Sequence, residues 1–138
     1  MKDKPILGKN VSLIDTPNFG SEPYLIKIGD DTTVSFGCSF VTHDGATRVI
    51  RHLPNHDPQT CIFGPIIIGK NCFIGCNSTI LCNVHIGDNT IVGAGSLVNQ
   101  DLPSNIKKIQ TNLLGQDLLF LTDNGVFSKN KIDFGSKT

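Results

Sequence analysis

A six-residue repeat is the feature that most constrains how this chain can fold. Steps of six from Ile28, and again from Ile62, land on a bulky apolar residue every time. The series is Ile28, Val34 and Phe40, then Ile62, Ile68, Ile74, Ile80, Ile86, Val92 and Val98. A helix spaces apolar residues by three and four, and a simple strand alternates by two. Strict sixes therefore predict short flat strands and tight turns, three of which close one triangular coil of roughly 18 residues.

Two further positions of the repeat support this interpretation. The residue after the apolar one is often glycine, which suits a sharp turn of the backbone, and the fourth residue after it is usually small or slim. The slim residues are Thr32, Cys38, Cys72, Ser78, Val84, Thr90 and Ser96. We expect branched aliphatics to stack in the interior and the slim residues to fill the tighter inward positions. The expected class is all-β.

The repeat is interrupted once and stops before the end of the chain. After Phe40 we expect an excursion loop over 45–61, whose prolines and polar residues are typical of loops. We expect the sixes to restart at Ile62. Loops on rigid scaffolds often carry function. The β-helical domain should cover 1–106, with an irregular first coil over 1–27. Residues 107–138, which include NLLGQDLLFL, should cap or extend the same domain as a short helix or a strand.

Composition narrows the partners. Twelve Lys and Arg balance twelve Asp and Glu, and the basic residues cluster only at Lys107-Lys108, so we expect no nucleic-acid partner. No segment has the roughly 18 apolar residues that span a bilayer, and the N-terminus lacks a leader's apolar core, so we expect no membrane insertion and a cytoplasmic location. Five cysteines in no zinc spacing predict reduced thiols and no metal site.

The repeat resembles the left-handed parallel β-helix of the hexapeptide-repeat acyltransferases, and only that resemblance implies the handedness. The resemblance covers about 25–105 and includes GPIIIG at 64–69 and IGDNTIVGAGSLVNQDLP at 86–103. These segments are similar to those of galactoside, maltose and capsular-polysaccharide O-acetyltransferases. The resemblance implies a homotrimer with acetyl-CoA as the acyl donor.

His43 is the candidate catalytic residue. It lies in SFVTHDG, 39–45, where the sixes break off. A polar turn at the exit from the coil is one explanation of His43 and Asp44. The other is a general base, since histidine titrates near neutral pH and takes protons from hydroxyls. The family resemblance implies the second. Asp44 need not orient the imidazole, because adjacent side chains on an extended strand face opposite ways.

The resemblance also implies binding residues. For acetyl-CoA these are Cys76, Ala94, Asn99 and Gln100, with Ser96 packed nearby. The acceptor pocket is expected to involve Asp44, Arg48, Arg51 and His56 of the excursion and its base. The chain departs from the family where Phe73 replaces a common Trp, where Cys82-Asn83 replaces Pro-Gly, and where a Gly-Asn-Pro-Ala signature is absent after Pro103.

The expected function is acetyl-CoA-dependent O-acetylation of a sugar hydroxyl, in surface-polysaccharide biosynthesis. Cys38 occupies an inward position, so a nucleophilic thiol is not expected. Three alternatives stay open. One is a hexapeptide-repeat protein that has lost catalysis and serves in binding or assembly; another is a sugar N-acetyltransferase. The third is a zinc enzyme similar to the γ-class carbonic anhydrases, although the spacing of the four histidines does not match that family.

Overall fold

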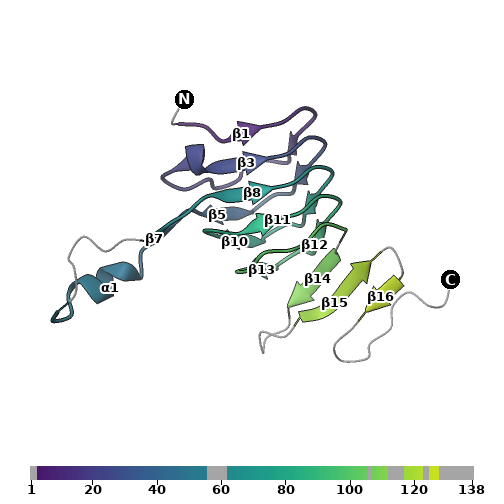
Figure 1. The fold of residues 1–138 in the computed structure, drawn as a ribbon. Helices are drawn as coiled ribbons and strands as arrows, with labels where there is room; N and C mark the ends of the chain where they lie inside the picture. The colour runs from purple at the N-terminus through teal and green to yellow at the C-terminus, as the bar shows by residue number, and fades with distance from the viewer. Residues whose placement is uncertain (1–2, 56–61, 106, 112–116, 123–124, 128–138) are drawn as a thin grey trace.

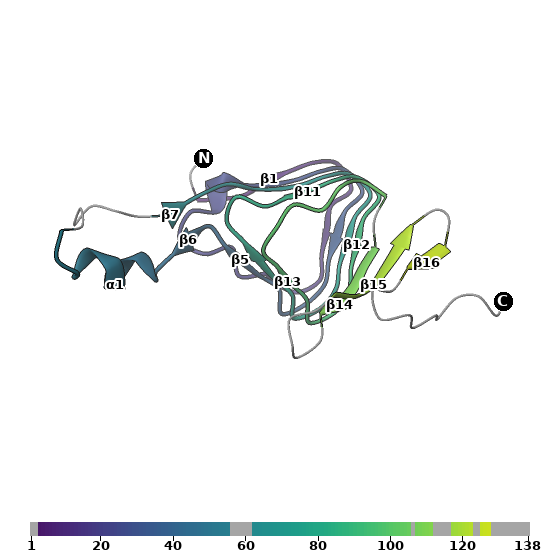
Figure 2. The same cartoon turned by 60° about the horizontal axis from the view of Figure 1, so that its bottom comes forward.

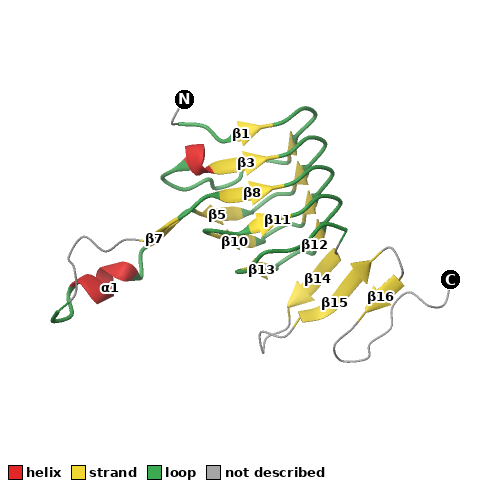
Figure 3. Ribbon diagram, in the orientation of Figure 1, coloured by secondary structure: helices red, strands yellow, loops and turns green. Residues whose placement is uncertain are grey.

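The computed structural model describes residues 3–55, 62–105, 107–111, 117–122 and 125–127. Its strands wind into stacked triangular coils, so the chain forms a parallel β-helix with three flat faces (Figures 1 and 2). Helix is confined to two short segments among the described residues, the 3₁₀ turn η1 (Pro23–Leu25) and α1 (Thr47–Arg51), as Figure 3 shows. None of the described helices is long and apolar enough to cross a bilayer.

Each face is a sheet of parallel strands, one from each coil. The first face contains β1 (Ile6–Leu7), β3 (Ile26–Ile28), β8 (Ile66–Ile68) and β11 (His85–Ile86). The second contains β2 (Ser12–Leu13), β4 (Thr33–Val34), β9 (Phe73–Ile74) and β12 (Ile91–Val92). The third contains β5 (Ser39–Val41), β10 (Thr79–Leu81) and β13 (Leu97–Val98). We call the turns after these faces the first, second and third corners.

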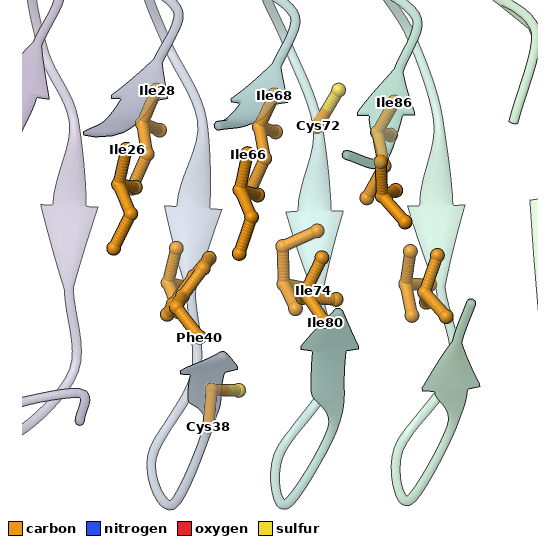
Figure 4. Packing of buried hydrophobic residues seen from close by; sticks show 14 of the residues in the cluster. Ile26, Ile28, Cys38, Phe40, Ile66, Ile68, Cys72, Ile74, Ile80 and Ile86 are labelled. Atoms are coloured by element: carbon orange, nitrogen blue, oxygen red, sulfur yellow. The ribbon is translucent and has the colours of Figure 1, made fainter. Parts of the chain in front are cut away.

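The core consists of the apolar positions of the repeat. Ile28 pairs with Ile68, and Ile68 pairs with Ile86, so each aliphatic side chain stacks on its counterpart one coil away (Figure 4). These three side chains are at most 1% exposed. Because every coil buries the apolar face of the next, the stack shares one continuous core, and the sequence prediction for these positions is confirmed.

The slim inward residues bury polar atoms that bond to the backbone of the next coil. Thr32 Oγ1 donates to the Gly69 carbonyl at 2.9 Å, and Ser78 Oγ donates to the Gly93 carbonyl at 3.1 Å. No buried side-chain nitrogen or oxygen among the described residues lacks a partner. Buried polar groups cost free energy unless they are bonded, so these contacts explain why small hydroxyl residues suit the slots.

Asparagines hold the first corner in the left-handed conformation. Asn71, Asn89 and Asn105 have φ of 54°, 54° and 64°. Asn71 Nδ2 donates to Asn89 Oδ1 at 2.9 Å, and Asn89 Nδ2 donates to Asn105 Oδ1 at 3.0 Å. Asparagine tolerates positive φ better than other residues with side chains, and its amide bonds to the copy below. The positive-φ position of this corner therefore repeats without needing glycine.

The excursion leaves the coil at the third corner. β6 (His43–Asp44) pairs antiparallel with β7 (Ile62–Phe63), and this ribbon leads to α1 in an arm that projects from the coils (Figures 1 and 2). The expected restart of the sixes at Ile62 is wrong, because Ile62 pairs with Asp44 in the ribbon. The coil resumes at β8. Paired residues on β3 and β8 are 40 positions apart in the sequence, whereas those on β8 and β11 are 18 apart. The excursion therefore adds 22 residues to a regular coil.

The first coil is more regular than expected but has its own insertion at the same corner. Leu13 pairs with Val34, 21 residues later, whereas Ile80 pairs with Val98 after 18. The three extra residues lie between Asn18 and Ile26, where η1 forms. Both insertions therefore lie at one corner, one coil apart, and they bring Gly20–Leu25 next to the base of the arm.

The described part of the tail is made of strands. β14 (Lys107–Thr111) pairs parallel with β12, and β15 (Asp117–Thr122) and β16 (Gly125–Phe127) add antiparallel to it. The sheet of the second face thus continues past the last coil. Of the two expected conformations, strand is the one seen here, while residues 112–116 and 128–138 lie outside the described residues.

Candidate functional site

His43 lies at the third corner, where β5 ends and the ribbon begins. Its side chain is 30% exposed, and its ring packs on that of Phe63 with the centroids 4.3 Å apart. Phe63 comes from the returning strand of the ribbon, so the arm's own base supports the imidazole. The ring is thus placed by packing while part of it stays open to solvent, as a group that exchanges protons with a substrate requires.

Glu22 is the acid that contacts this imidazole. Its Oε1 lies 3.3 Å from His43 Nδ1, and its Oε2 accepts a hydrogen bond of 2.8 Å from Thr42 Oγ1. Partial burial raises the pKa of Glu22, but hydrogen bonds from Thr42, Ser21 and His43 outweigh it and hold the pKa below its ordinary value. An ionised carboxylate can only accept, so in this contact Nδ1 carries a proton and Nε2 is the basic nitrogen of the neutral ring.

Sequence reasoning missed Glu22, which lies 21 residues before His43. The signal was the first coil's irregular corner, with Gly20 and Pro23 on either side of the glutamate. Once the first coil is aligned with the second, the three additional residues are the ones that carry this carboxylate toward the imidazole.

Asp44 does not orient His43. This agrees with the expectation that adjacent side chains on an extended strand face opposite ways. Its Oδ1 accepts a hydrogen bond from the Ala46 backbone N–H at 2.8 Å, and its carbonyl accepts one from Thr47 Oγ1 at 3.2 Å. The aspartate therefore stabilises the turn into α1. Its exposed side chain is close to His43 only because the two residues are neighbours in the chain.

A hollow of about 130 Å³ adjoins His43 on the side of the first coil. It is lined by Asn18, Gly20, Ser21, Ser39, Phe40, Val41, Thr42 and His43. Arg48 and Arg51, on α1, do not line it; Arg48 is exposed and Arg51 half-buried. His56 lies outside the described residues. The structure thus joins His43 to residues of the first coil and leaves the two arginines on the arm.

The expected cofactor residues divide between two corners. Asn99 and Gln100 are exposed at the third corner, the corner of His43, in the last full coil. Cys76, half-buried, and Ala94, exposed, stack at the second corner, where the Gly95 backbone N–H donates to the Cys76 carbonyl at 2.8 Å. The third face separates the two corners, so one chain does not bring these residues together.

Ser96 is an interior residue. It is 1% exposed, and its hydroxyl donates to the Gly93 carbonyl at 2.7 Å. Its side chain therefore fills a slim slot of the repeat and does not reach the surface of the chain. Any part it takes in binding would be to hold the backbone of GAGS, 93–96, in shape.

The inward thiols are not activated. Cys38 is 1% exposed and bonds to the Gly75 carbonyl at 3.2 Å, and burial raises the pKa of its thiol, as it does for Cys72. A raised pKa keeps a thiol protonated and unreactive. Among the described residues, no group of three or more His, Cys, Asp and Glu side chains is arranged to hold a metal ion.

Comparison with known proteins adds independent evidence on the family. Residues 65–100 match the model of the bacterial transferase hexapeptide (six repeats). The chain is 48% identical to protein CapG of Staphylococcus aureus over 93 residues, which cover 67% of this chain and 52% of that protein. It is 36% identical to the galactoside O-acetyltransferase of Escherichia coli K12 over 86 residues, 59% of this chain and 42% of that protein. The chain thus spans about half the length of these relatives.

A solved structure shows the same architecture. A hexapeptide-repeat acetyltransferase of Vibrio cholerae O1 biovar eltor, complexed with acetyl coenzyme A, has a TM-score of 0.50 and 28% identity over 73% of this chain and 52% of that chain. These likenesses confirm the expected left-handed parallel β-helix. His43 and Glu22 lie outside the residues that match the family model.

Proposed function

The chain belongs to the hexapeptide-repeat family of bacterial transferases, and from that premise we propose that it transfers an acetyl group from acetyl-CoA to a sugar hydroxyl. The observation that carries the proposal is the contact of Glu22 with His43 beside an open hollow, at the corner where the arm leaves the coils. A half-exposed imidazole held by a carboxylate suits a general base for a hydroxyl group.

In this proposal His43 Nε2 takes the proton of the acceptor hydroxyl as that oxygen attacks the thioester carbonyl. The C–O bond forms, the C–S bond breaks, and the imidazolium gives its proton to the leaving thiolate, which departs as the thiol of CoA. Glu22 fixes the tautomer and stabilises the imidazolium while it carries the proton. Since the hydroxyl attacks directly, no acyl-enzyme forms, consistent with the unactivated thiols of Cys38 and Cys72.

The donor site is proposed to form between two copies of the chain. Within one chain the third face separates His43 from Cys76 and Ala94, whereas two copies packed side by side can set the third corner of one against the second corner of the other. A homotrimer closes such contacts in a ring. We therefore place acetyl-CoA in that seam, against Cys76 and Ala94 from one subunit and Asn99 and Gln100 from the other, with Ser96 behind.

The acceptor side is proposed to include the arm. Asp44, Arg48, Arg51 and His56 belong to the excursion or its base, and we propose that they hold parts of the acceptor beyond the reacting hydroxyl. Galactoside O-acetyltransferase is named for a sugar acceptor, and it supports a sugar here. We further propose that the protein acts in surface-polysaccharide biosynthesis and is located in the cytoplasm, where acetyl-CoA is available.

Thermal unfolding with and without acetyl-CoA tests this function against a chain that has lost catalysis. A ligand that binds only the folded state at 100 times its Kd stabilises it by about 2.7 kcal/mol, which is readily detected as a rise in Tm. We expect acetyl-CoA to raise the Tm in this way and acetate alone to raise it less. If Tm is unchanged at millimolar acetyl-CoA, the donor assignment is wrong.

A further inference from the structure

The described residues that line the hollow beside His43 are uncharged, apart from the histidine itself. Its lining includes the polar residues Asn18, Ser21 and Ser39, beside Phe40 and Val41 of β5. The carboxylate of Glu22 contacts the imidazole at Nδ1. Among the described residues, the lining holds no lysine or arginine to offset that negative charge.

Three of the polar side chains have hydrogen-bonding capacity to spare. Asn18 Oδ1 accepts a hydrogen bond from the Gly20 backbone N–H at 3.0 Å, while its NH₂ group donates to no other described residue. Ser39 lies on the outward side of β5 and is half-buried, and its hydroxyl makes no hydrogen bond within the described part of the chain. Ser21 bonds to the carboxylate of Glu22, which leaves its oxygen able to accept.

These groups match a ring with several neighbouring hydroxyls. The amide of Asn18 donates, the Ser39 hydroxyl donates and accepts, and the Ser21 oxygen accepts, so hydroxyls on adjacent carbons find partners of both kinds. A carboxylate in the same place would face Glu22 with no cation beside it, and like charges in a partly dehydrated site repel.

We infer that this hollow, walled by the inserted corner of the first coil, binds the reacting sugar ring of the acceptor and selects an uncharged ring over a carboxylated one. The inference rests on the proposed transfer function and adds its specificity. The first coil thus has two roles at the site: Glu22 holds the base, and Asn18 and Ser21 hold the acceptor. Selection comes from the sign of the charge next to His43.

The test compares methyl β-glucoside with methyl β-glucuronide, which differ only in the group at C6, as acceptors with saturating acetyl-CoA. We expect kcat/KM to favour the glucoside by about tenfold or more, a factor that corresponds to about 1.4 kcal/mol. The preference should narrow with added salt, because ions screen the repulsion. The ratio of the two kcat/KM values should also fall toward one in Glu22→Gln, whatever that substitution does to the overall rate.

Side-chain variants test the ring contacts. Asn18→Asp keeps the oxygen that bonds to Gly20 and removes the NH₂ donor, and Ser39→Ala removes the other hydroxyl. Each should raise the KM for the glucoside several-fold and leave the KM for acetyl-CoA and the Tm unchanged. Thr33→Ala, which removes an outward hydroxyl from the second face, is the matched control and should change neither constant.

The outcomes separate this inference from the proposed function. If the wild-type protein acetylates the glucuronide as well as the glucoside, or if Asn18→Asp and Ser39→Ala leave the acceptor KM unchanged, the role of the hollow is wrong while sugar acetylation stands. If acetyl-CoA raises the Tm but neither glycoside is acetylated, the acceptor assignment is wrong and donor binding survives. If there is neither binding nor transfer, both proposals fail.

Discussion

Glu22 Oε1 lies 3.3 Å from His43 Nδ1, although 21 residues of sequence separate them. The contact exists because the first coil carries three additional residues at the corner where the second coil releases the arm. A change in the length of either corner would separate the two groups. The register of the coils therefore positions the acid against the imidazole.

Glu22→Gln should lower the rate of acetyl transfer about tenfold or more. The amide keeps the shape of the side chain but loses the charge that stabilises the imidazolium, and it can present a donor to Nδ1 and so favour the wrong tautomer. The measurement is kcat with both substrates saturating. Asp30→Asn, which alters a carboxylate on a turn remote from His43, serves as the control. Unchanged kcat in Glu22→Gln would remove the acid from the site.

Glu22 should also make stability depend on pH on the acid side. Its pKa in the folded chain is below the ordinary value of 4.5, so the unfolded chain binds the proton more readily. The stabilisation is fully present above pH 4.5 and is lost as the pH falls through the lower folded pKa. Urea unfolding between pH 3 and 6 measures this loss. The wild type should lose more stability on acidification than Glu22→Gln, and parallel curves would contradict the prediction.

Gly29→Ala should destabilise the coil stack, while Gly45→Ala should not. A Cβ at Gly29 would lie 2.6 Å from backbone atoms of Gly69 in the next coil, and a Cβ at Gly45 would meet nothing within 4 Å. Overpacking of this kind costs about 1–3 kcal/mol, and a substitution in open space stays within about 0.5 kcal/mol. Urea unfolding at one fixed protein concentration compares the two variants. Equal stability would show that the coils are not in such close contact.

The thiols should differ in reactivity. Cys38 and Cys72 are at most 4% exposed, and burial raises the pKa of both, whereas Cys82 is half-buried. Alkylation follows the exposed thiolate, so Cys82 should react with iodoacetamide at least about tenfold faster than the other two. Peptide mass spectrometry over a time course measures each rate. Comparable rates at Cys38 and Cys82 in folded protein would contradict the inward position of Cys38.

The repeat made most of the coil predictable, because each apolar residue at a step of six must find its counterpart in the next coil. That argument held for Ile68, Ile74 and Ile80 and failed for Ile62, which keeps the spacing by coincidence and belongs to the ribbon. Spacing alone cannot distinguish a coil position from a ribbon position, since β7 of the ribbon is short and apolar like the strands of the coils. Only the pairing of Ile28 with Ile68 fixes where the coil resumes.

The site was only partly predictable for a related reason. His43 stood out because it follows the last regular hexad before the break, but Glu22 comes from a coil with weak periodicity and reaches the histidine through register. The separation of Cys76 and Ala94 from His43 also depends on which corner each hexad occupies. Sequence identifies the members of a repeat; the stacking of coils decides which of them become neighbours.

The most direct test of the central claim is transfer of the acetyl group from isotopically labelled acetyl-CoA to a neutral methyl glycoside, followed by mass spectrometry, for the wild type and His43→Ala. His85→Ala is the control, since His85 is an exposed residue of the first face. The account predicts labelled O-acetyl glycoside from the wild type and His85→Ala, about 100-fold less from His43→Ala, and the same Tm for all three. Full transfer by His43→Ala would contradict it.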